Sequence, residues 1–371
     1  GYLMSRARDL ANVADDVSTG TVVTTASPSL GRRNLIINGA MQVAQRGTSF
    51  SVSGNSYTLD RWLLTYGSSA AVTSTVTQES DTPTGSGFAS SLKVETTNTV
   101  APDANKNFGC QYSFEGQDLQ MLSYGTSSAK NLTLSFWVKS SKTGTYGLQV
   151  LSNGKTRTIL KSYTVDSANT WEQKTILIEG DTSSGIDNNN AQSLRVIWPL
   201  YTGPDDIYAT TGWFANGAFL SVPDQVNLFD ATGATWQITG VQLEVGSVAS
   251  TYEHRSYGEE LAACQRYYWR FAGSSGNGYA GIGSGGFINA TLFNAFVPYP
   301  VEMRASPTFS IGTSLYVVTS GFPSISSINA NFGNQHSGRV QFTTTSSTAG
   351  FGGSAHTSNA STSFFDADAE L

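Results

Sequence analysis

The chain contains a series of short segments in which apolar and polar residues alternate, and these limit the fold more than any other feature. In residues 132–139, every second side chain is Leu, Phe or Val. A period of two places alternate side chains on opposite faces of a β-strand, so this pattern predicts a strand with one buried face. Similar segments are 146–151, 156–165, 171–178, 194–200 and 235–245. Many short strands separated by Gly, Asn and Asp predict a jelly-roll β-sandwich over residues 34–255.

Glycines at two places predict local geometry within this sandwich. Asn153-Gly154 lies between two of the strand segments, and this pair tolerates the positive φ of a tight turn. We therefore expect the segments on either side of it to form a hairpin. In the segment 235–245 the apolar parity changes at Gly240, which predicts a β-bulge there.

Residues 1–33 carry a helical pattern followed by a linker. The pattern predicts a short helix with a heptad seam, which either forms a coiled coil or lies on a neighbouring domain. A Ser-, Thr-, Pro- and Gly-rich stretch over 18–31 predicts a linker. The apolar residues of the seam, spaced alternately by four and three, are Leu3, Ala7, Leu10, Ala14 and Val17.

A second short helix is expected to link two domains over residues 256–270. Ser256 and Glu259 have the spacing of a capping box, in which each side chain satisfies a free backbone N–H. Gly258 in the first turn weakens this helix. The residues expected on one helical face are Tyr257, Leu261, Cys264 and Tyr268.

Residues 271–371 are expected to form a β-rich C-terminal tip domain with very few charges. Charged residues make up 13% of the whole chain, against about 25% in ordinary proteins. Such a surface is expected either to be buried against copies of itself or to contact neutral ligands. The segments 287–297, 309–318 and 339–345 resemble strands, and the charged residues between 271 and 365 are Glu302, Arg304 and Arg339.

Composition excludes several classes of protein. The formal net charge of −6 provides no basic field for nucleic acid, and no apolar run approaches the ~18 residues of a membrane helix. The start of the chain lacks the apolar core of a signal peptide. We expect a chain that is processed, tagged or cut from a longer one, with Met4 a candidate start. The two cysteines, Cys110 and Cys264, are expected to be buried apolar side chains.

The sequence offers little for catalysis or cofactor binding. His254, His336 and His356 are isolated from one another and from the cysteines, so neither a catalytic triad nor a zinc site is expected. The glycine pattern of 276–281 and 281–286 matches a dinucleotide fingerprint, but no helix can follow it. We therefore expect no cofactor.

Several carboxylates are candidates for catalytic pairs or for calcium ligands. Polar turns explain these residues equally well, so we expect no enzyme activity and no metal site. The pairs are Asp181 with Asp187, Asp205 with Asp206, and Glu253 with Glu259, and the calcium candidates are Asp181, Asp187 and Asn188.

Aromatic residues among neutral polar ones are the best candidates for ligand binding. Sugars present an apolar face and a rim of hydroxyls, which flat rings and Asn, Ser or Thr side chains complement. The alternative for each ring is a place in the core. The candidates are Trp198, Tyr201, Tyr208 and Trp213 in the sandwich, and Tyr279, Phe287, Tyr299 and Tyr316 in the tip domain.

Glycine-rich segments of the tip domain are expected to act in one of two ways. Residues 273–286 and 350–353 either form variable loops that contact the receptor, or permit tight packing at a trimer axis. The aromatic residues nearby favour recognition in this domain.

Several motifs resemble the jelly-roll domains of bacteriophage tail fibres. Asn34-Leu-Ile-Ile-Asn-Gly-Ala-Met-Gln-Val and Tyr57-Thr-Leu-Asp-Arg-Trp62 resemble the start of such a domain, and Ile238–Gly246 resembles its closing strand. The resemblance covers about 34–268, and nothing comparable covers 269–371. Further matching segments are Arg6–Asn12, Leu134–Lys139, Asn169–Lys174 and Tyr252–Tyr268.

The resemblance implies a carbohydrate-binding-module-like domain in a homotrimeric fibre of the virion. It implies an N-terminal region that contacts other virion tail proteins, and a distal tip that binds host cell-surface polysaccharide or lipopolysaccharide. Two alternatives stay open: a tailspike-type depolymerase, although no repeat of 20–50 residues is present, and a purely structural fibre or baseplate component.

Overall fold

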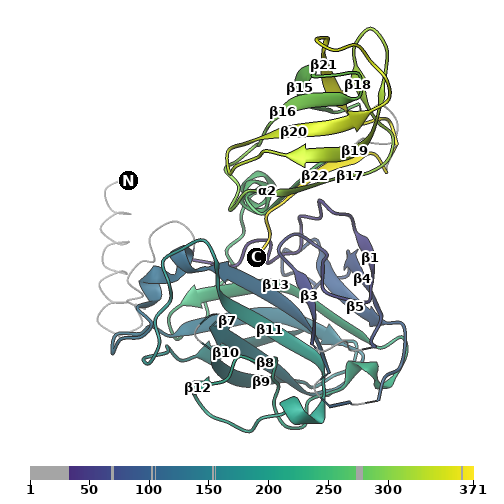
Figure 1. Cartoon of the computed structure of the whole chain (residues 1–371). Helices are drawn as coiled ribbons and strands as arrows, with labels where there is room; N and C mark the ends of the chain where they lie inside the picture. The colour runs from purple at the N-terminus through teal and green to yellow at the C-terminus, as the bar shows by residue number, and fades with distance from the viewer. Residues whose placement is uncertain are drawn as a thin grey trace, which may run out of the picture.

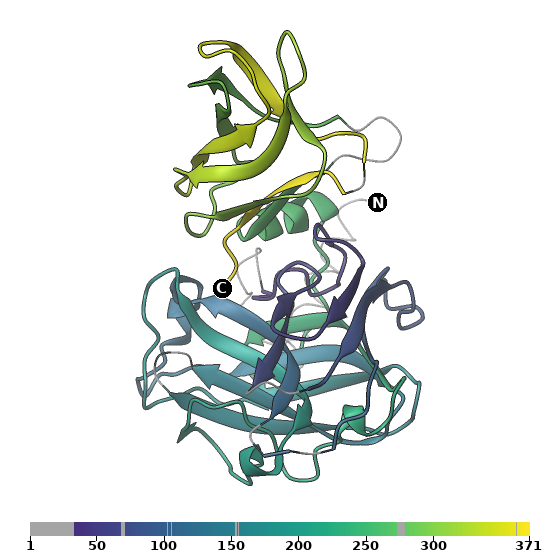
Figure 2. The ribbon, with the colours of Figure 1, turned by 45° about the vertical axis from the view of Figure 1, so that its right-hand side comes forward.

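The computed structural model describes residues 33–371 except 68–70, 102, 105, 153, 155, 273–278 and 361. The helix and linker expected over 1–33 therefore lie outside the described residues, apart from Arg33. Two β bodies are stacked along one axis, with a short helix between them (Figures 1 and 2). We call the larger body the sandwich and the smaller one, formed by β14–β22, the C-terminal domain.

The sandwich consists of two antiparallel sheets, which confirms the predicted mainly-β fold class. The sheet of order β1-β4-β5-β13-β7-β10 contains β1 Ser49–Val52, β4 Ser74–Glu79, β5 Ser91–Thr96, β13 Thr235–Val245, β7 Leu132–Ser140 and β10 Glu172–Ile178. The sheet of order β12-β9-β8-β11-β6-β3-β2 contains β12 Phe214–Ala215, β9 Arg157–Val165, β8 Gly144–Ser152, β11 Gln192–Thr202, β6 Asn107–Glu115, β3 Leu63–Gly67 and β2 Ser56–Tyr57.

Large aromatic side chains fill the space between the two sheets. Trp62 and Trp198 have no exposed surface, and their ring centroids lie 5.7 Å apart. Phe136 from β7 meets Trp198 edge to face at 5.8 Å. Burying each such side chain contributes about 1.5–3 kcal/mol, so the alternation along the strands stabilises this core directly.

Both glycine predictions for the sandwich are confirmed. β8 and β9 pair antiparallel on either side of Gly154. At Gly240, φ is +60° and the pairing of β13 with β7 shifts register between Thr239 and Gln242. A Cβ atom at Gly240 would lie 2.5 Å from the Phe88 ring, so both the backbone angle and the space require glycine.

The linking helix α2, Tyr257–Gln265, has the predicted capping box. It is shorter than the expected segment 256–270, because the backbone turns after Arg266 and Tyr268–Ala272 form β14. The expected apolar face is also wrong in part: Cys264 is buried, but Tyr257 is 56% exposed. No helix of the described residues is long and apolar enough to cross a bilayer.

The C-terminal domain combines a closed six-stranded barrel with a three-stranded sheet. The barrel interior and the inner face of the sheet share one apolar core. The sheet, of order β14-β22-β17, contains β22 Phe364–Asp368 and β17 Thr308–Ile311 beside β14. The barrel, of order β15-β16-β20-β19-β18-β21, contains β15 Gly281–Phe287, β16 Leu292–Pro298, β20 Ser337–Thr344, β19 Ser324–Asn331, β18 Leu315–Val318 and β21 Gly352–His356.

Two of the strands expected in this domain are each interrupted by a turn. Within 287–297 the carbonyl oxygen of the Asn289 side chain accepts two backbone N–H bonds, which turns the chain between β15 and β16. Within 309–318 the residues between β17 and β18 include Ser314 at φ +60°, which no continuous strand accommodates. The third expected segment, 339–345, lies largely in β20.

The glycine-rich segment at the start of the barrel is not a loop over its described part. Residues 281–286 belong to β15, and 352–353 belong to β21. A Cβ atom at Gly285 would lie 1.7 Å from the carbonyl oxygen of Asn294, so the strand approaches its neighbour too closely for any side chain. The prediction of contact loops is therefore wrong for these residues, and the glycines permit close packing within the barrel.

Candidate functional site

The four aromatic candidates of the sandwich do not form one surface. Trp198 and Tyr201 are completely buried, and the Tyr201 hydroxyl donates to the carbonyl oxygen of Ala101 at 2.9 Å. These two side chains belong to the core and are not available to a ligand. Tyr208 is 38% exposed, while the Trp213 indole donates to the Glu179 carbonyl oxygen at 2.6 Å.

The four candidates of the C-terminal domain divide into two pairs. Phe287 is buried in the barrel, and Tyr299 packs against Trp269 where the barrel meets the three-stranded sheet. Tyr279 and Tyr316, in contrast, meet at the surface with ring centroids 6.3 Å apart. Tyr279 is 61% exposed.

Tyr316 is the centre of a group of four rings at the surface, of which Tyr279 and Phe322 are exposed and Tyr316 and His356 half-buried. We call this group the ring cluster: Tyr279, Tyr316, Phe322 and His356. Tyr316 of β18 lies directly opposite His356 of β21, and their rings are nearly parallel, 16° apart at 5.9 Å. Phe322, in the turn between β18 and β19, is 71% exposed and meets Tyr316 edge-on at 5.9 Å. The cluster therefore presents ring faces and ring edges to solvent.

Sequence reasoning identified two members of the ring cluster and missed the other two. From the sequence, His356 is a candidate only for a catalytic base, and nothing singles out Phe322 as a ligand contact. The signal available for Phe322 is its place between Gly321 and Pro323, because an apolar ring in a tight turn has little core to enter. No sequence signal indicates that His356 faces Tyr316, since closure of the barrel brings them together.

The ring cluster carries hydrogen-bonding groups but no permanent charge. The Ser354 hydroxyl lies 2.7 Å from Nε2 of His356, on the same face of β21. Partial burial and the nearby Tyr279 raise the pKa of Tyr316, so its hydroxyl is a neutral donor at physiological pH. Hydroxyl and imidazole groups around flat rings suit a ligand that combines apolar faces with hydroxyls.

The ring cluster lies on the part of the barrel that faces away from the sandwich. In Figure 1, β18 and β21 occupy the far end of the C-terminal domain, while β17, β22 and α2 lie toward the sandwich. The cluster is therefore accessible without any movement of the two bodies.

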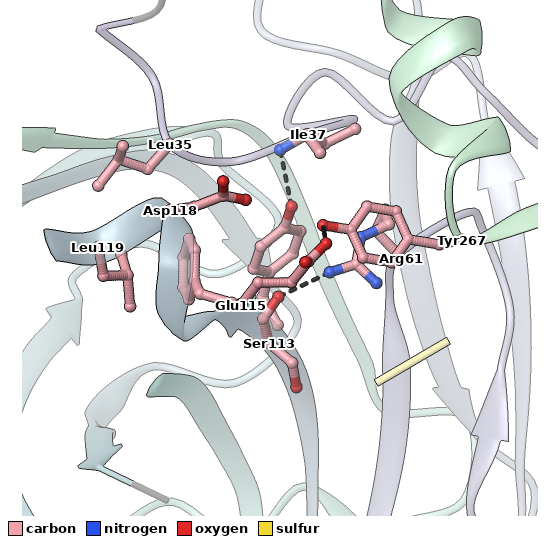
Figure 3. A pocket seen from close by; sticks show the side chains of 10 residues that line it. Leu35, Ile37, Arg61, Ser113, Glu115, Asp118, Leu119 and Tyr267 are labelled. Carbon is pink, nitrogen blue, oxygen red and sulfur yellow. Dashed lines mark hydrogen bonds between the residues drawn. The ribbon is translucent and has the colours of Figure 1, made fainter. Parts of the chain in front are cut away.

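A small cavity at the junction of the two bodies is structural (Figure 3). Beside it, the buried carboxylate of Glu115 accepts two bonds from the Arg266 guanidinium, each 2.9 Å, and one of 2.6 Å from the Tyr267 hydroxyl. Burial raises the pKa of Tyr267, so this hydroxyl keeps its proton. The cavity volume of about 20 Å³ suits roughly one water molecule and no larger ligand.

A wider hollow of about 500 Å³ lies along β17, and its one cationic lining residue, Arg304, is already hydrogen-bonded to the backbone. The Arg304 guanidinium donates to the backbone oxygens of Asn190, Ala369 and Glu370, at 2.7–3.0 Å. The bond to Asn190 joins the C-terminal domain to the sandwich, and the other two fix the end of the chain after β22, so we assign this hollow no ligand.

Several candidate carboxylates have structural partners. Asp181 accepts two bonds from the Arg157 guanidinium, of 2.9 and 3.0 Å, and is 1% exposed. Glu259 caps α2, and Glu253 accepts from the backbone N–H of Asn34 at 2.7 Å. Within the described part of the chain, no group of three or more His, Cys, Asp or Glu could hold a metal ion. Both cysteines are free and buried, as predicted.

Comparisons with known proteins found alignments to solved structures but no family. No family model and no curated protein matches the chain. The enzymatically active domain of tailspike protein 4 of bacteriophage CBA120 aligns over 57% of this chain and 21% of its own, at 13% identity and a TM-score of 0.32. This chain therefore spans about a fifth of that protein's length.

Two further structures align over nearly their whole length. One is a family 11 carbohydrate-binding module of Clostridium thermocellum, in complex with a mixed-linked tetrasaccharide, at 14% identity and a TM-score of 0.28, covering 55% of this chain and 98% of the module. The other is a putative sugar binding protein of Bacteroides thetaiotaomicron, at 11% identity and a TM-score of 0.32, covering 57% and 99%. The assignment of a site rests on the geometry of this chain alone.

Proposed function

We propose that this protein binds glycans without cleaving them, and that the ring cluster is the contact surface. The observation that carries the proposal is the grouping of Tyr279, Phe322 and His356 around Tyr316 at the far end of the barrel. Flat rings cover the apolar face of a sugar, and the neighbouring hydroxyl and imidazole groups bond to its rim.

The biological role that fits this activity is recognition of host surface polysaccharide by a bacteriophage tail fibre. Two observations support it: the motifs of residues 34–268 that resemble tail-fibre jelly rolls, and the position of the ring cluster away from the sandwich. In this proposal the protein is a homotrimer of the virion, attached to other tail proteins through its N-terminal region.

A polysaccharide depolymerase is the main alternative, and the structural use of the carboxylates argues against it. Glycoside hydrolysis needs two carboxyl groups that face a substrate. Asp181, Glu253 and Glu259 are instead engaged with an arginine, a backbone N–H and a helix end. A structural component without a ligand is the other alternative, and it requires no exposed aromatic surface.

A binding assay with Tyr316→Ala tests the proposal. Full-length wild type, Tyr316→Ala and the matched control Tyr257→Ala, an exposed tyrosine of α2, are compared on an array of bacterial glycans and on host cells. We expect Tyr316→Ala to weaken binding about tenfold or more, because a central aromatic contact is lost, and the control to bind like wild type.

Two outcomes contradict the proposal. Equal binding by both variants removes the ring cluster as the site. Release of reducing sugar from a bound polysaccharide by the wild type identifies an enzyme instead.

A further inference from the structure

A second exposed aromatic patch lies on other strands of the barrel and contains an arginine. Phe296 of β16 faces outward directly opposite Arg339 of β20. Phe332, just after β19, donates its backbone N–H to the carbonyl oxygen of Arg339 at 3.0 Å and so extends the same row. Phe296 is 58% exposed and Phe332 is 53% exposed.

The guanidinium of Arg339 is oriented by stacking. Its central carbon lies 4.1 Å from the centroid of the Phe332 ring. A guanidinium stacked on a ring keeps its N–H groups pointing outward in its own plane, where they match the two oxygens of a carboxylate or phosphate. Among the described residues, Arg339 makes no ion pair within 4.0 Å.

Arg339 is the one cationic side chain that the barrel offers to a ligand. Charged residues between 281 and 356 are restricted to Glu302, Arg304 and Arg339. Arg304 is bonded to three backbone oxygens at the junction, and Glu302 lies 3.9 Å from His336. With so little competing charge on the barrel, Arg339 is the group there that can attract an anion.

Amide side chains flank the arginine on the same outer face. The Gln341 amide donates to the Asn294 side chain at 3.0 Å, and the Asn329 amide donates to the Gln341 side chain. Asn294 and Gln341 lie two residues from Phe296 and Arg339 along β16 and β20, so they share the outward face. These bonds leave amide N–H groups of Asn294 and an amide oxygen of Asn329 for hydroxyl groups of a ligand.

We propose that Phe296, Phe332 and Arg339 form a subsite for an acidic saccharide, in which Arg339 binds a carboxylate or phosphate on the sugar. This inference rests on the proposed glycan binding by the barrel, and it adds a second subsite and a charge preference. The guanidinium holds the anion through two parallel bonds, Phe296 covers the apolar face, and the amides bind hydroxyls. The subsite is separate from the ring cluster, because β15 lies between β16 and β21 in the closed barrel (Figure 1).

Charge complementarity favours an acidic sugar over a second copy of the barrel as the occupant. One carboxylate, Glu302, is present between 281 and 356, so another barrel offers little to pair with a guanidinium. Acidic saccharides carry an anion, apolar ring faces and hydroxyls together, which are the three chemical features that this patch complements.

The test uses the full chain and pairs of glycans that differ only in charge. The probes are uronic-acid oligosaccharides with their carboxyl-reduced forms, and phosphorylated lipopolysaccharide core oligosaccharides before and after phosphatase treatment. The variants are Arg339→Gln and Arg339→Lys. The control is Lys130→Gln, which removes one positive charge from an exposed position of the sandwich.

We expect the wild type to prefer the acidic member of at least one pair, and added salt to reduce this preference. Arg339→Gln should weaken binding of the acidic glycan about tenfold and leave binding of its neutral form unchanged. Arg339→Lys should bind the acidic glycan more weakly than the wild type and more tightly than Arg339→Gln, because lysine keeps the charge and loses the two parallel hydrogen bonds. Lys130→Gln should bind like wild type. The pair that responds identifies the anion as carboxylate or phosphate.

Three results overturn the subsite. If Arg339→Gln and Lys130→Gln bind every acidic glycan equally well while Tyr316→Ala loses glycan binding, the subsite is wrong and the proposed function stands. If the wild type binds neither acidic nor neutral glycans, the subsite and the proposed function are both wrong. If Arg339→Gln changes the oligomeric state in light scattering and not the charge preference, the patch is a contact between copies.

Discussion

Glu370 connects the C-terminal domain to the sandwich through buried charge. Its carboxylate pairs with the guanidinium groups of Arg46 and Arg61, and the exposed fractions of the three side chains are 3%, 9% and 1%. Arg61 also donates to the Ser113 carbonyl oxygen at 2.7 Å and stacks on the Tyr267 ring at 3.5 Å. Because charges removed from water are costly unless they are paired, Arg61 depends on this carboxylate, whereas Arg46 also pairs with Asp368 at 3.1 Å.

Replacing Glu370 should therefore destabilise the protein strongly. Glu370→Ala removes the carboxylate that pairs with the buried Arg61 guanidinium, while Arg46 keeps its pair with Asp368. We expect the free energy of unfolding to fall by about 3 kcal/mol, mostly because of the buried charge of Arg61. Glu302→Ala is the control, because its carboxylate is about half exposed and should change stability by less than about 0.5 kcal/mol. Chemical denaturation measures both, and equal stability of the two variants would show that Glu370 is not the coupling residue.

At the scale of elements, β15 shows how a strand can be built from residues that usually weaken strands. Four of its seven residues are glycines, and it pairs with β16 on one side and β21 on the other. At Gly285 and Gly283 the neighbouring carbonyl oxygens of Asn294 and Phe296 occupy the place of a side chain. The missing side chains are thus a condition for closing this barrel.

Two alanine substitutions in β15 distinguish a steric clash with the neighbouring strand from the general effect of replacing a glycine. Gly285→Ala places a Cβ atom 1.7 Å from a backbone oxygen, so we expect a loss of about 2 kcal/mol or more in the unfolding of the C-terminal domain. At Gly286 the nearest atom would be 3.5 Å away, so Gly286→Ala should be neutral or slightly stabilising. Denaturation followed by aromatic circular dichroism measures the difference, and similar behaviour of the two variants would contradict the packing described here.

Elements whose pattern reflects burial of one face could be predicted from the sequence. β7 and the hairpin of β8 and β9 alternate clearly, and Gly240 marks its bulge, because local residues alone determine these features. β15 could not be predicted, because a glycine run carries no alternation and its strand geometry depends on β16 and β21. The ring cluster could be predicted only in part, because it too depends on strand pairing. Tyr316 and His356 are 40 positions apart and meet only when β18 pairs with β21.

At the scale of the whole molecule, the low charge of the C-terminal domain is the feature that an isolated monomer does not explain. The same domain also exposes large apolar side chains: Ile288 is 53% exposed and Phe351 is 47% exposed. The backbone N–H of Phe287 donates to the carbonyl oxygen of Phe351, which places Ile288 and Phe351 at the same end of the barrel. Exposed apolar residues in a surface of few charges are typical of the core of an interface between subunits.

We therefore expect a homotrimer in solution, with a mass by light scattering of three times the 39.4 kDa subunit. Phe351→Asp should weaken this assembly, since a charge in an interface core loses its hydration. Met121→Asp, at a similarly exposed apolar residue of the sandwich, is the control. A single 39.4 kDa species of the wild type at micromolar concentration would contradict the prediction.

The central position of β22 in the sheet β14-β22-β17 determines the order in which the protein can be completed on the ribosome. Neither β14 nor β17 has its partner until residues 364–368 have been synthesised, and the contact of Glu370 with Arg61 spans 309 positions. At about 5–20 residues per second, the stretch from Tyr268 to Asp368 takes roughly 5–20 s to make. All strands of the sandwich precede that stretch, so the sandwich can fold alone during those seconds. In the C-terminal domain, β14 and β17 each have an unpaired edge until β22 is made, and such edges are prone to aggregation.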